Sequence, residues 1–262
     1  MFMATMHGHR PAARCAARLQ GKSYALVLVV FAVLLVFAAG CDANRPADER
    51  LAPRAAAGPT AAPHTAAVSR DGRDAADIDV VSGATTVTVR AADLGDTLAR
   101  ATTPDDSPLA PSFVVADPDL QVHLAGTGPS AVLIEVNRDV TWRLRFSGGY
   151  TSVTVDGTAA ARVDGVDLAS GVTRADLGLP APRGTTEVRV AGGANDVTVR
   201  VPAGPPAKVT IGGGANTVTV DGANHSGVQA GTVFAPSTWD ATTDRYAIAA
   251  TSGVATLTVD RH

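Results

Sequence analysis

The chain of 262 residues is poor in the residue types that build covalent cross-links, soft-metal sites and stacking surfaces. Its two cysteines, Cys15 and Cys41, lie at the N-terminal end, so a disulfide framework and a cysteine zinc site are excluded from the rest of the chain. The net charge of −3 offers no basic surface, and we predict no nucleic-acid partner. Aromatic residues make up only 4%, which leaves few platforms for sugar rings.

Motifs of catalysis and cofactor binding are also missing. The chain contains no nucleophile elbow, no Walker loop and no His-Glu-x-x-His pair. "GTGPS" at 126–130 has two glycines two apart, but no helical stretch or acidic partner follows it, so dinucleotide binding is not expected. The sequence predicts a protein that is not an enzyme, with no catalytic residue, no cofactor and no metal site.

One stretch invites comparison with the calcium-binding repeat Gly-Gly-x-Gly-x-Asp. In "GGANDVTV" at 192–199, Asn195 stands where that repeat needs glycine, and Asp196 comes one position early. The second copy has Thr217 in the place of Asp196. Calcium takes six to eight oxygen ligands, several of them charged, so turn formation explains this motif better.

The N-terminus reads as a targeting segment. Four basic residues and no acid precede "YALVLVVFAVLLVFAAG", an uncharged run from Tyr24 to Gly40. Small residues then lead to Cys41 in "AAGC", which resembles a bacterial lipobox with Ala38 where leucine is usual. The resemblance implies that Cys41 is lipidated, and the start could be Met1, Met3 or Met6. We predict a lipid-anchored protein at the extracytoplasmic face of the cell membrane.

The alternative to a lipid anchor is a single uncleaved transmembrane helix, since the apolar run reaches the short limit for crossing a bilayer. Either reading leaves the rest of the chain outside the cytoplasm. We assign residues 1–41 to the export signal. Residues 42–77 are rich in alanine and proline with few large apolar side chains, which indicates a disordered linker. Residues 78–262 form the predicted ectodomain.

The ectodomain repeats one short pattern: glycine, three residues, an apolar residue, threonine, valine. It occurs as "GATTVTV" at 83–89, "GYTSVTV" at 149–155, "GANDVTV" at 193–199, "GANTVTV" at 214–220 and "GVATLTV" at 253–259. The apolar residues are two apart and share one face, which is typical of a strand. We attribute the leading glycine to a turn with positive φ.

Two periods govern these repeats. Gly-Gly-Ala-Asn recurs after 21 residues, and "RFSGGYTSVTVDG" at 145–157 matches "TIGGGANTVTVDG" at 210–222, 65 residues later. Because 65 is close to three times 21, the pattern favours an all-β fold, a β-helix or β-roll-like stack of short strands with coils of about 21 residues. The alternative is a β-sandwich. In the stack, Asn195 and Asn216 are expected to be direct neighbours.

The run from Val140 to Val259 resembles the toast-rack family, bacterial domains of stacked strands often labelled putative adhesins and usually tethered to a membrane. The resemblance rests on "VTWRLRFSGGYTSVTVDG", "GVDLASGVTRADLGLP", "VRVAGGANDVTVRVP", "IGGGANTVTVDG" and "DRYAIAATSGVATLTV". It implies a stacked-strand fold and an envelope location. The family brings no catalytic motif that could be carried over to this chain.

The resulting prediction is a non-enzymatic envelope lipoprotein that presents a rigid β-domain to envelope components, either a protein or a polysaccharide. Trp239 in "APSTWDATTDRY" is the candidate contact residue, with packing over an end of the stack as its alternative. A polysaccharide-binding or polysaccharide-cleaving exoprotein is the alternative function. Asp156 and Asp221 occupy equivalent places, but we predict that they lie too far apart for a catalytic pair.

Overall fold

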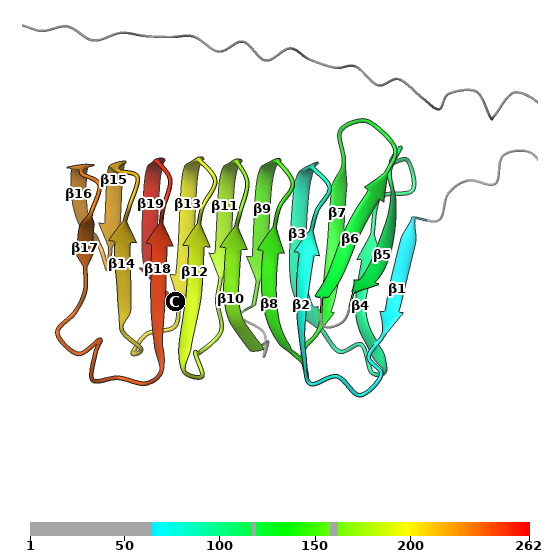
Figure 1. The fold of residues 1–262 in the computed structure, drawn as a ribbon, viewed down its shortest axis with the longest axis horizontal. Coiled ribbons are helices and arrows are strands. Elements are labelled where there is room, and N and C mark those ends of the chain that lie inside the picture. The colour runs from blue at the N-terminus through cyan, green and yellow to red at the C-terminus, as the bar shows by residue number, and fades with distance from the viewer. Residues whose placement is uncertain (1–63, 117–118, 158–161) are drawn as a thin grey trace, which may run out of the picture. The chain divides into compact units, whose positions relative to one another are not determined.

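The structure is a computed structural model that describes residues 64–116, 119–157 and 162–262. These residues form nineteen strands in two sheets and no helix. The all-β stack predicted from the repeats is confirmed, and Figure 1 shows its strands side by side along one axis. No helix in the described part of the chain is long and apolar enough to cross a membrane.

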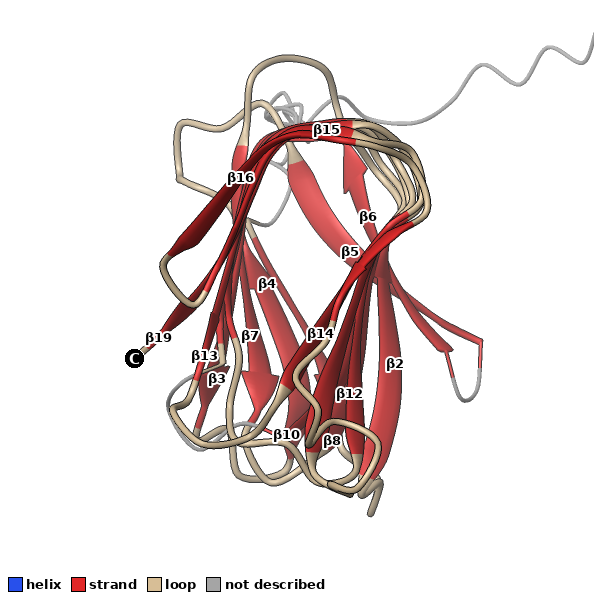
Figure 2. Ribbon diagram, turned by 90° about the vertical axis from the view of Figure 1, so that its left-hand side faces the viewer, coloured by secondary structure: helices blue, strands red, loops and turns tan. Residues whose placement is uncertain are grey.

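The two sheets face each other across one continuous core (Figure 2). Sheet A has ten strands, in spatial order β1 (Thr65–Ser69), β4 (Thr97–Thr102), β7 (Ala131–Asn137), β3 (Ala84–Ala92), β9 (Tyr150–Asp156), β11 (Val172–Gly178), β13 (Ala194–Val201), β19 (Val254–Arg261), β15 (Ala215–Val220) and β16 (Ala223–Val228). Sheet B has nine, in the order β17 (Thr232–Phe234), β14 (Ala207–Ile211), β18 (Arg245–Ala250), β12 (Thr185–Val190), β10 (Arg162–Leu168), β8 (Thr141–Phe146), β2 (Ala75–Val80), β6 (Asp119–Ala125) and β5 (Ala110–Ala116).

Each coil of the stack is one sheet B strand, a tight corner and the sheet A strand that follows it. The sheet B strands of four successive coils begin at Thr141, Arg162, Thr185 and Ala207, 21 to 23 residues apart, which explains the sequence period. Alternate residues of each strand point inward, so valine, leucine and isoleucine fill the space between the sheets. Trp142 is fully buried there, as its place in an alternating strand predicts.

The order of the coils in space differs from their order in the chain at both ends. The coil β2–β3 lies between β6–β7 and β8–β9, and the last coil, β18–β19, lies between β12–β13 and β14–β15. The C-terminus therefore lies within the stack and not at its end (Figure 1). The prediction that Asn195 and Asn216 are direct neighbours is wrong: β19 separates their strands, which puts them roughly 9.6 Å apart.

The corner glycines have a different cause from the one we predicted. Of those that open the repeats, only Gly214 has a positive φ. A Cβ at Gly148 would lie 2.5 Å from the carbonyl of Ser82, and a Cβ at Gly192 would lie 2.0 Å from that of Ser170. Glycine is required at Gly148 and Gly192 because the backbone of the adjacent coil passes too close for any side chain. The glycines that follow them and open the repeats, Gly149 and Gly193, have room for a Cβ, with no atom nearer than 4.0 Å.

Antiparallel strands close both ends of the stack. At one end β4 and β5 run against β7 and β6, and at the other β16 and β17 run against β15 and β14. Asp221 and Gly222, with φ of 50° and 81°, form the tight turn into β16. The expectation that the Asp-Gly pair marks a turn is confirmed at this position.

The ectodomain begins earlier than the sequence indicated. Strands β1 and β2 start at Thr65 and Ala75, so the end of the predicted linker, residues 42–77, belongs to the sheets. Short, alanine-rich segments hide these strands in the sequence, because alanine carries little strand signal. The remainder of the linker, the apolar run and Cys41 lie outside the described residues.

Candidate functional site: a charged groove across sheet B

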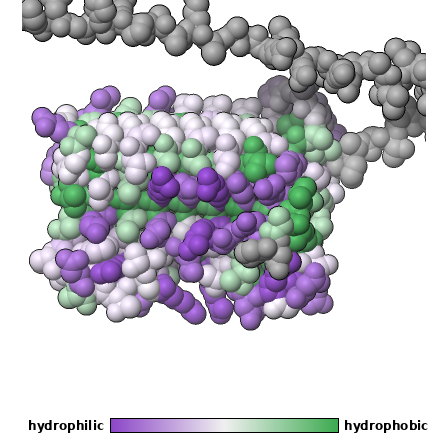
Figure 3. All heavy atoms as spheres, viewed as in Figure 1, coloured by the Kyte–Doolittle hydropathy of each residue, from purple (hydrophilic) through white to green (hydrophobic). Residues whose placement is uncertain are grey.

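The outer faces of the two sheets carry different chemistry. Sheet A presents rows of threonine across neighbouring strands: Thr86, Thr88, Thr154, Thr198, Thr256, Thr258, Thr217 and Thr219. Sheet B presents charged side chains at the corresponding alternate positions of β6, β2, β8, β10 and β12. Figure 3 shows hydrophilic side chains in two bands across this face, with more apolar atoms between them.

Parallel register builds the two bands. Residues that pair across the five strands form a first row of Asp119, Asp77, Arg143, Gly165 and Glu187. Two residues further along each strand is a second row of Gln121, Asp79, Arg145, Asp167 and Arg189. Each row follows the axis of the stack, with one side chain about every 4.8 Å.

Between and around these rows lie two adjoining hollows, of about 240 and 310 Å³. Both are lined by Arg143 and Asp167, so they form one continuous feature, which we call the sheet B groove. Its floor is the sheet itself at Ile78, Gly165 and Val166. A groove of this shape can receive an extended molecule lying along the stack.

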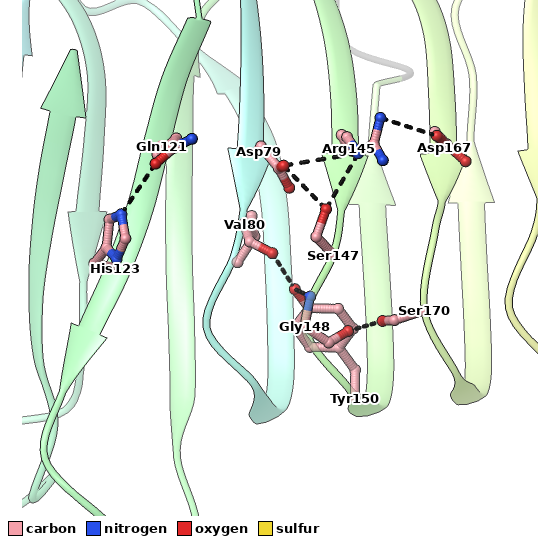
Figure 4. Close-up of polar contacts among 10 residues, drawn as sticks. All are labelled: Asp79, Val80, Gln121, His123, Arg145, Ser147, Gly148, Tyr150, Asp167 and Ser170. Carbon is pink, nitrogen blue, oxygen red and sulfur yellow. Dashed lines mark hydrogen bonds and ion pairs between the residues drawn. The ribbon is translucent and has the colours of Figure 1, made fainter. Parts of the chain in front are cut away.

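In the middle of the second row, Arg145 lies between two acidic residues, Asp79 and Asp167, on the neighbouring strands (Figure 4). Its guanidinium lies 3.7 Å from a carboxylate oxygen of Asp79 and 3.8 Å from one of Asp167. Ser147 donates to Asp79 at 2.9 Å and accepts from Arg145 at 3.2 Å. The network holds the two carboxylates in a fixed arrangement on β2 and β10, with β8 between them.

Hydrogen-bonding capacity is left over in the groove. The second carboxylate oxygens of Asp79 and Asp167 are shielded from the surface and have no hydrogen-bond partner among the described residues. Within that same part of the chain, Arg143, Glu187 and Arg189 make no ion pair, although they line the groove. The exposed side chains of Arg143, Glu187 and Arg189 are therefore available to donate to and accept from a bound molecule, whereas the shielded oxygens of Asp79 and Asp167 are not.

Gly165 interrupts the first row between Arg143 and Glu187. It sits mid-strand in β10, where the parallel register shifts between Val163 and Gly165. A Cβ at this position would lie 3.3 Å from the carbonyl oxygen of Glu187 and 3.7 Å from the side chain of Arg143. A glycine inside a strand often marks a close approach of another molecule, and here it leaves a notch in the row.

Hydrogen bonds to a buried tyrosine, Tyr150, hold the end of the strand that carries Arg145. Tyr150 donates a hydrogen bond to the carbonyl of Val80 and accepts one from the amide of Gly148 at 2.9 Å, which joins β2 to the corner after β8 (Figure 4). Burial raises the pKa of the Tyr150 hydroxyl well above its usual value, and Asp79 adds to that rise. The hydroxyl therefore stays protonated and keeps donating at any physiological pH.

The sequence-predicted candidates lie elsewhere. Trp239 is 8% exposed, which agrees with the alternative that its ring packs against the stack and not with an exposed contact residue. Its ring nitrogen donates to the carbonyl of Tyr246 at 2.9 Å, and cations of Lys208 and Arg245 lie 3.5 and 3.9 Å from the ring centre. Trp239 thus fastens the loop between β17 and β18 onto sheet B.

Asp156 and Asp221 lie far apart, as predicted. They sit at the ends of β9 and β15, which are separated by β11, β13 and β19, so the carboxylates are about 19 Å apart along the stack. That separation exceeds the roughly 5–9.5 Å of a glycosidase pair. Among the described residues, no group of three or more acidic, histidine or cysteine side chains could hold a metal ion.

The comparisons with known proteins bear on the fold. The structure is similar to a putative cell adhesion protein from Clostridium sporogenes ATCC 15579, with a TM-score of 0.58 and 14% identity over 76% of this chain and 98% of the other. The two chains share one fold. No protein-family model and no curated protein matches the sequence.

Two further solved structures have the same kind of name. A putative adhesin from Bacteroides fragilis NCTC 9343 is 10% identical, with a TM-score of 0.26, over 74% of this chain and 95% of its own. One from Parabacteroides merdae ATCC 43184 is 12% identical, with a TM-score of 0.21, over 56% and 70%. At these scores neither adds to the fold assignment.

Proposed function

We propose that the protein is a non-enzymatic contact protein of the cell envelope, anchored through Cys41, which binds envelope components through the sheet B groove. The shared fold with the Clostridium sporogenes cell adhesion protein, which extends over 98% of that chain, is the observation that favours this role most. An outer face with ordered charges also suits a contact surface.

The groove supports binding better than cleavage. Asp79 and Asp167, in the middle of the groove, are both engaged by Arg145. A glycosidase pair needs one carboxyl group as proton donor and the other as base or nucleophile, whereas these two are joined through a single arginine. The arrangement suits recognition of a ligand that leaves unchanged.

Contact without cleavage is directly measurable. Full-length protein mixed with isolated cell envelopes of its host should sediment with them, and the envelope polysaccharide should show no increase in reducing ends over hours. The exoprotein alternative predicts the opposite pattern, a steady release of reducing ends. Protein that stays in the supernatant at every envelope concentration would contradict the contact role itself.

The anchor has a separate test in the native host. Cys41→Ser should abolish lipidation, so the variant should remain at precursor length, while wild type is shorter and still membrane-bound. A diacylglyceryl group supplies two acyl chains, which suffice for stable attachment where one does not. If wild type and variant both run at precursor length in the membrane fraction, the apolar run is a plain transmembrane helix and lipidation is wrong.

A further inference from the structure

We propose that the sheet B groove binds a hydroxyl-rich glycan chain, laid along the stack across β6, β2, β8, β10 and β12, with a preference for sugars that carry free amines. This inference rests on the proposed contact function and names its ligand class. It follows from three properties of the groove: its backbone, its charge and its notch.

The backbone of the groove strands has no amide or carbonyl groups free to hydrogen-bond a peptide. Strands β2, β8, β10 and β12 are interior strands of sheet B, paired on both sides, so their amide and carbonyl groups are used in the ladder. An extended peptide typically binds at a free strand edge or places apolar side chains in pockets. The apolar residues of the floor, Ile78 and Val166, are each only 2% exposed and provide no such pocket.

The contacts that remain for a ligand are therefore with side chains, and these include both hydrogen-bond donors and hydrogen-bond acceptors. The exposed carboxylate of Glu187 accepts hydrogen bonds, whereas the guanidiniums of Arg143 and Arg189 donate them. A sugar hydroxyl can donate and accept at the same time, so a chain of sugars can satisfy donors and acceptors along the rows. Hydrogen bonds to charged groups are stronger than those between neutral groups.

The charge balance sets the preference among glycans. Acidic side chains outnumber basic ones in the groove lining, with Asp77, Asp79, Asp119, Asp167 and Glu187 against Arg143, Arg145 and Arg189. The excess lies at the β6–β2 end, where Asp77 and Asp119 pair directly across the strands. A polyanionic glycan would be repelled there, and an amine would be attracted.

The notch at Gly165 lets the chain lie close to the sheet. Arg143 and Glu187 stand on either side of it, and the floor beneath is backbone. No aromatic side chain lines the groove, so stacking does not add to affinity and each site is expected to bind weakly. Many anchored copies facing one polymer would compensate through multivalency.

The test is a binding measurement on the full chain in a sugar-free detergent. Three immobilised hexasaccharides serve as probes: glucosamine, N-acetylglucosamine and galacturonate oligomers. We expect affinity to fall in that order, at the millimolar end of the range, with galacturonate the weakest. Hexalysine is the fourth probe, and its binding in place of the sugars would overturn the glycan assignment in favour of a basic peptide.

Single substitutions in the groove and on sheet A test whether the glycan binds in the groove. Glu187→Ala removes an exposed groove carboxylate and should weaken glucosamine hexamer binding about tenfold, the loss of one charged hydrogen bond. Asp196→Ala is the matched control: an exposed acid of the same coil, on β13 of sheet A, and it should change affinity by less than twofold. Gly165→Leu should abolish binding by filling the notch, with its melting temperature measured alongside to confirm that it folds.

Either of two results would overturn the assignment of the groove as a glycan site. Equal losses from Glu187→Ala and Asp196→Ala, or no binding of any hexasaccharide up to about 10 mM, would show that the groove is not a glycan site. Because sedimentation with envelopes is measured separately, retention on envelopes without oligosaccharide binding would refute this ligand class alone. Loss of both would refute the contact role as well.

Discussion

Leu257→Asp is expected to unfold the ectodomain. Leu257 is completely buried in β19, where it pairs in register with Val197 of β13 on one side and Val218 of β15 on the other. A carboxylate there would have no partner, and its burial costs about 3–5 kcal/mol, on top of the lost apolar contacts. Domains of this size are stable by only about 5–15 kcal/mol, so most of the margin would be removed.

The effect should spread beyond one coil. Because β18–β19 lies between two other coils, its failure to dock would leave β12–β13 and β14–β15 without a shared neighbour. Urea unfolding followed by far-ultraviolet circular dichroism measures the loss. Thr258→Asp, the next residue and on the outer face, is the control, and it should stay within about 0.5 kcal/mol of wild type. Equal stability of the two variants would contradict the burial of Leu257 between the two sheets.

The repeats allowed much of this architecture to be predicted from the sequence. The alternation of valine with threonine specifies which face of each strand is buried, and the 21-residue period specifies the length of a coil. Sequence order, however, does not specify spatial order. Nothing in "GVATLTV" at 253–259 shows that it docks between two earlier coils, because its inward residues fit any neighbouring pair equally well.

The corner glycines illustrate a second limit. Their recurrence pointed correctly to a bend, but only Gly214 among the glycines that open the repeats has a positive φ. Close approach of the neighbouring coil instead requires the glycine one residue earlier, at Gly148 and Gly192. A single sequence cannot separate these causes, since both demand the absence of a Cβ. The distinction matters for Gly192, where even alanine would collide with the carbonyl of Ser170.

The candidate site was not found in the sequence. Asp79, Arg145 and Asp167 are far apart in the chain and look like ordinary outward residues of amphipathic strands. Only the register across β2, β8 and β10 brings them together. A signal does exist: the outward positions of the sheet B strands that line the groove are mostly charged, whereas sheet A has more threonine, with charges such as Arg174, Asp176 and Asp196 among it. Trp239 drew attention instead, because a rare aromatic in a polar loop resembles a contact residue.

The central claim is that the protein meets its partner through the sheet B groove and not through the threonine face of sheet A. Glu187 and Thr198 belong to the same coil, on β12 and β13, and their side chains point outward from opposite faces. A benzophenone amino acid placed at either position in the full chain can capture a partner within reach on illumination of intact cells. It reacts with the C–H bonds of sugars and proteins alike.

The decisive measurement is therefore the yield of photo-cross-linked adduct from these two positions, read as a shift in mobility and as sugar content of the captured material. The groove model predicts a glycan-containing adduct from position 187 and none above background from position 198. An adduct from position 198 with none from position 187 would contradict it and assign contact to sheet A.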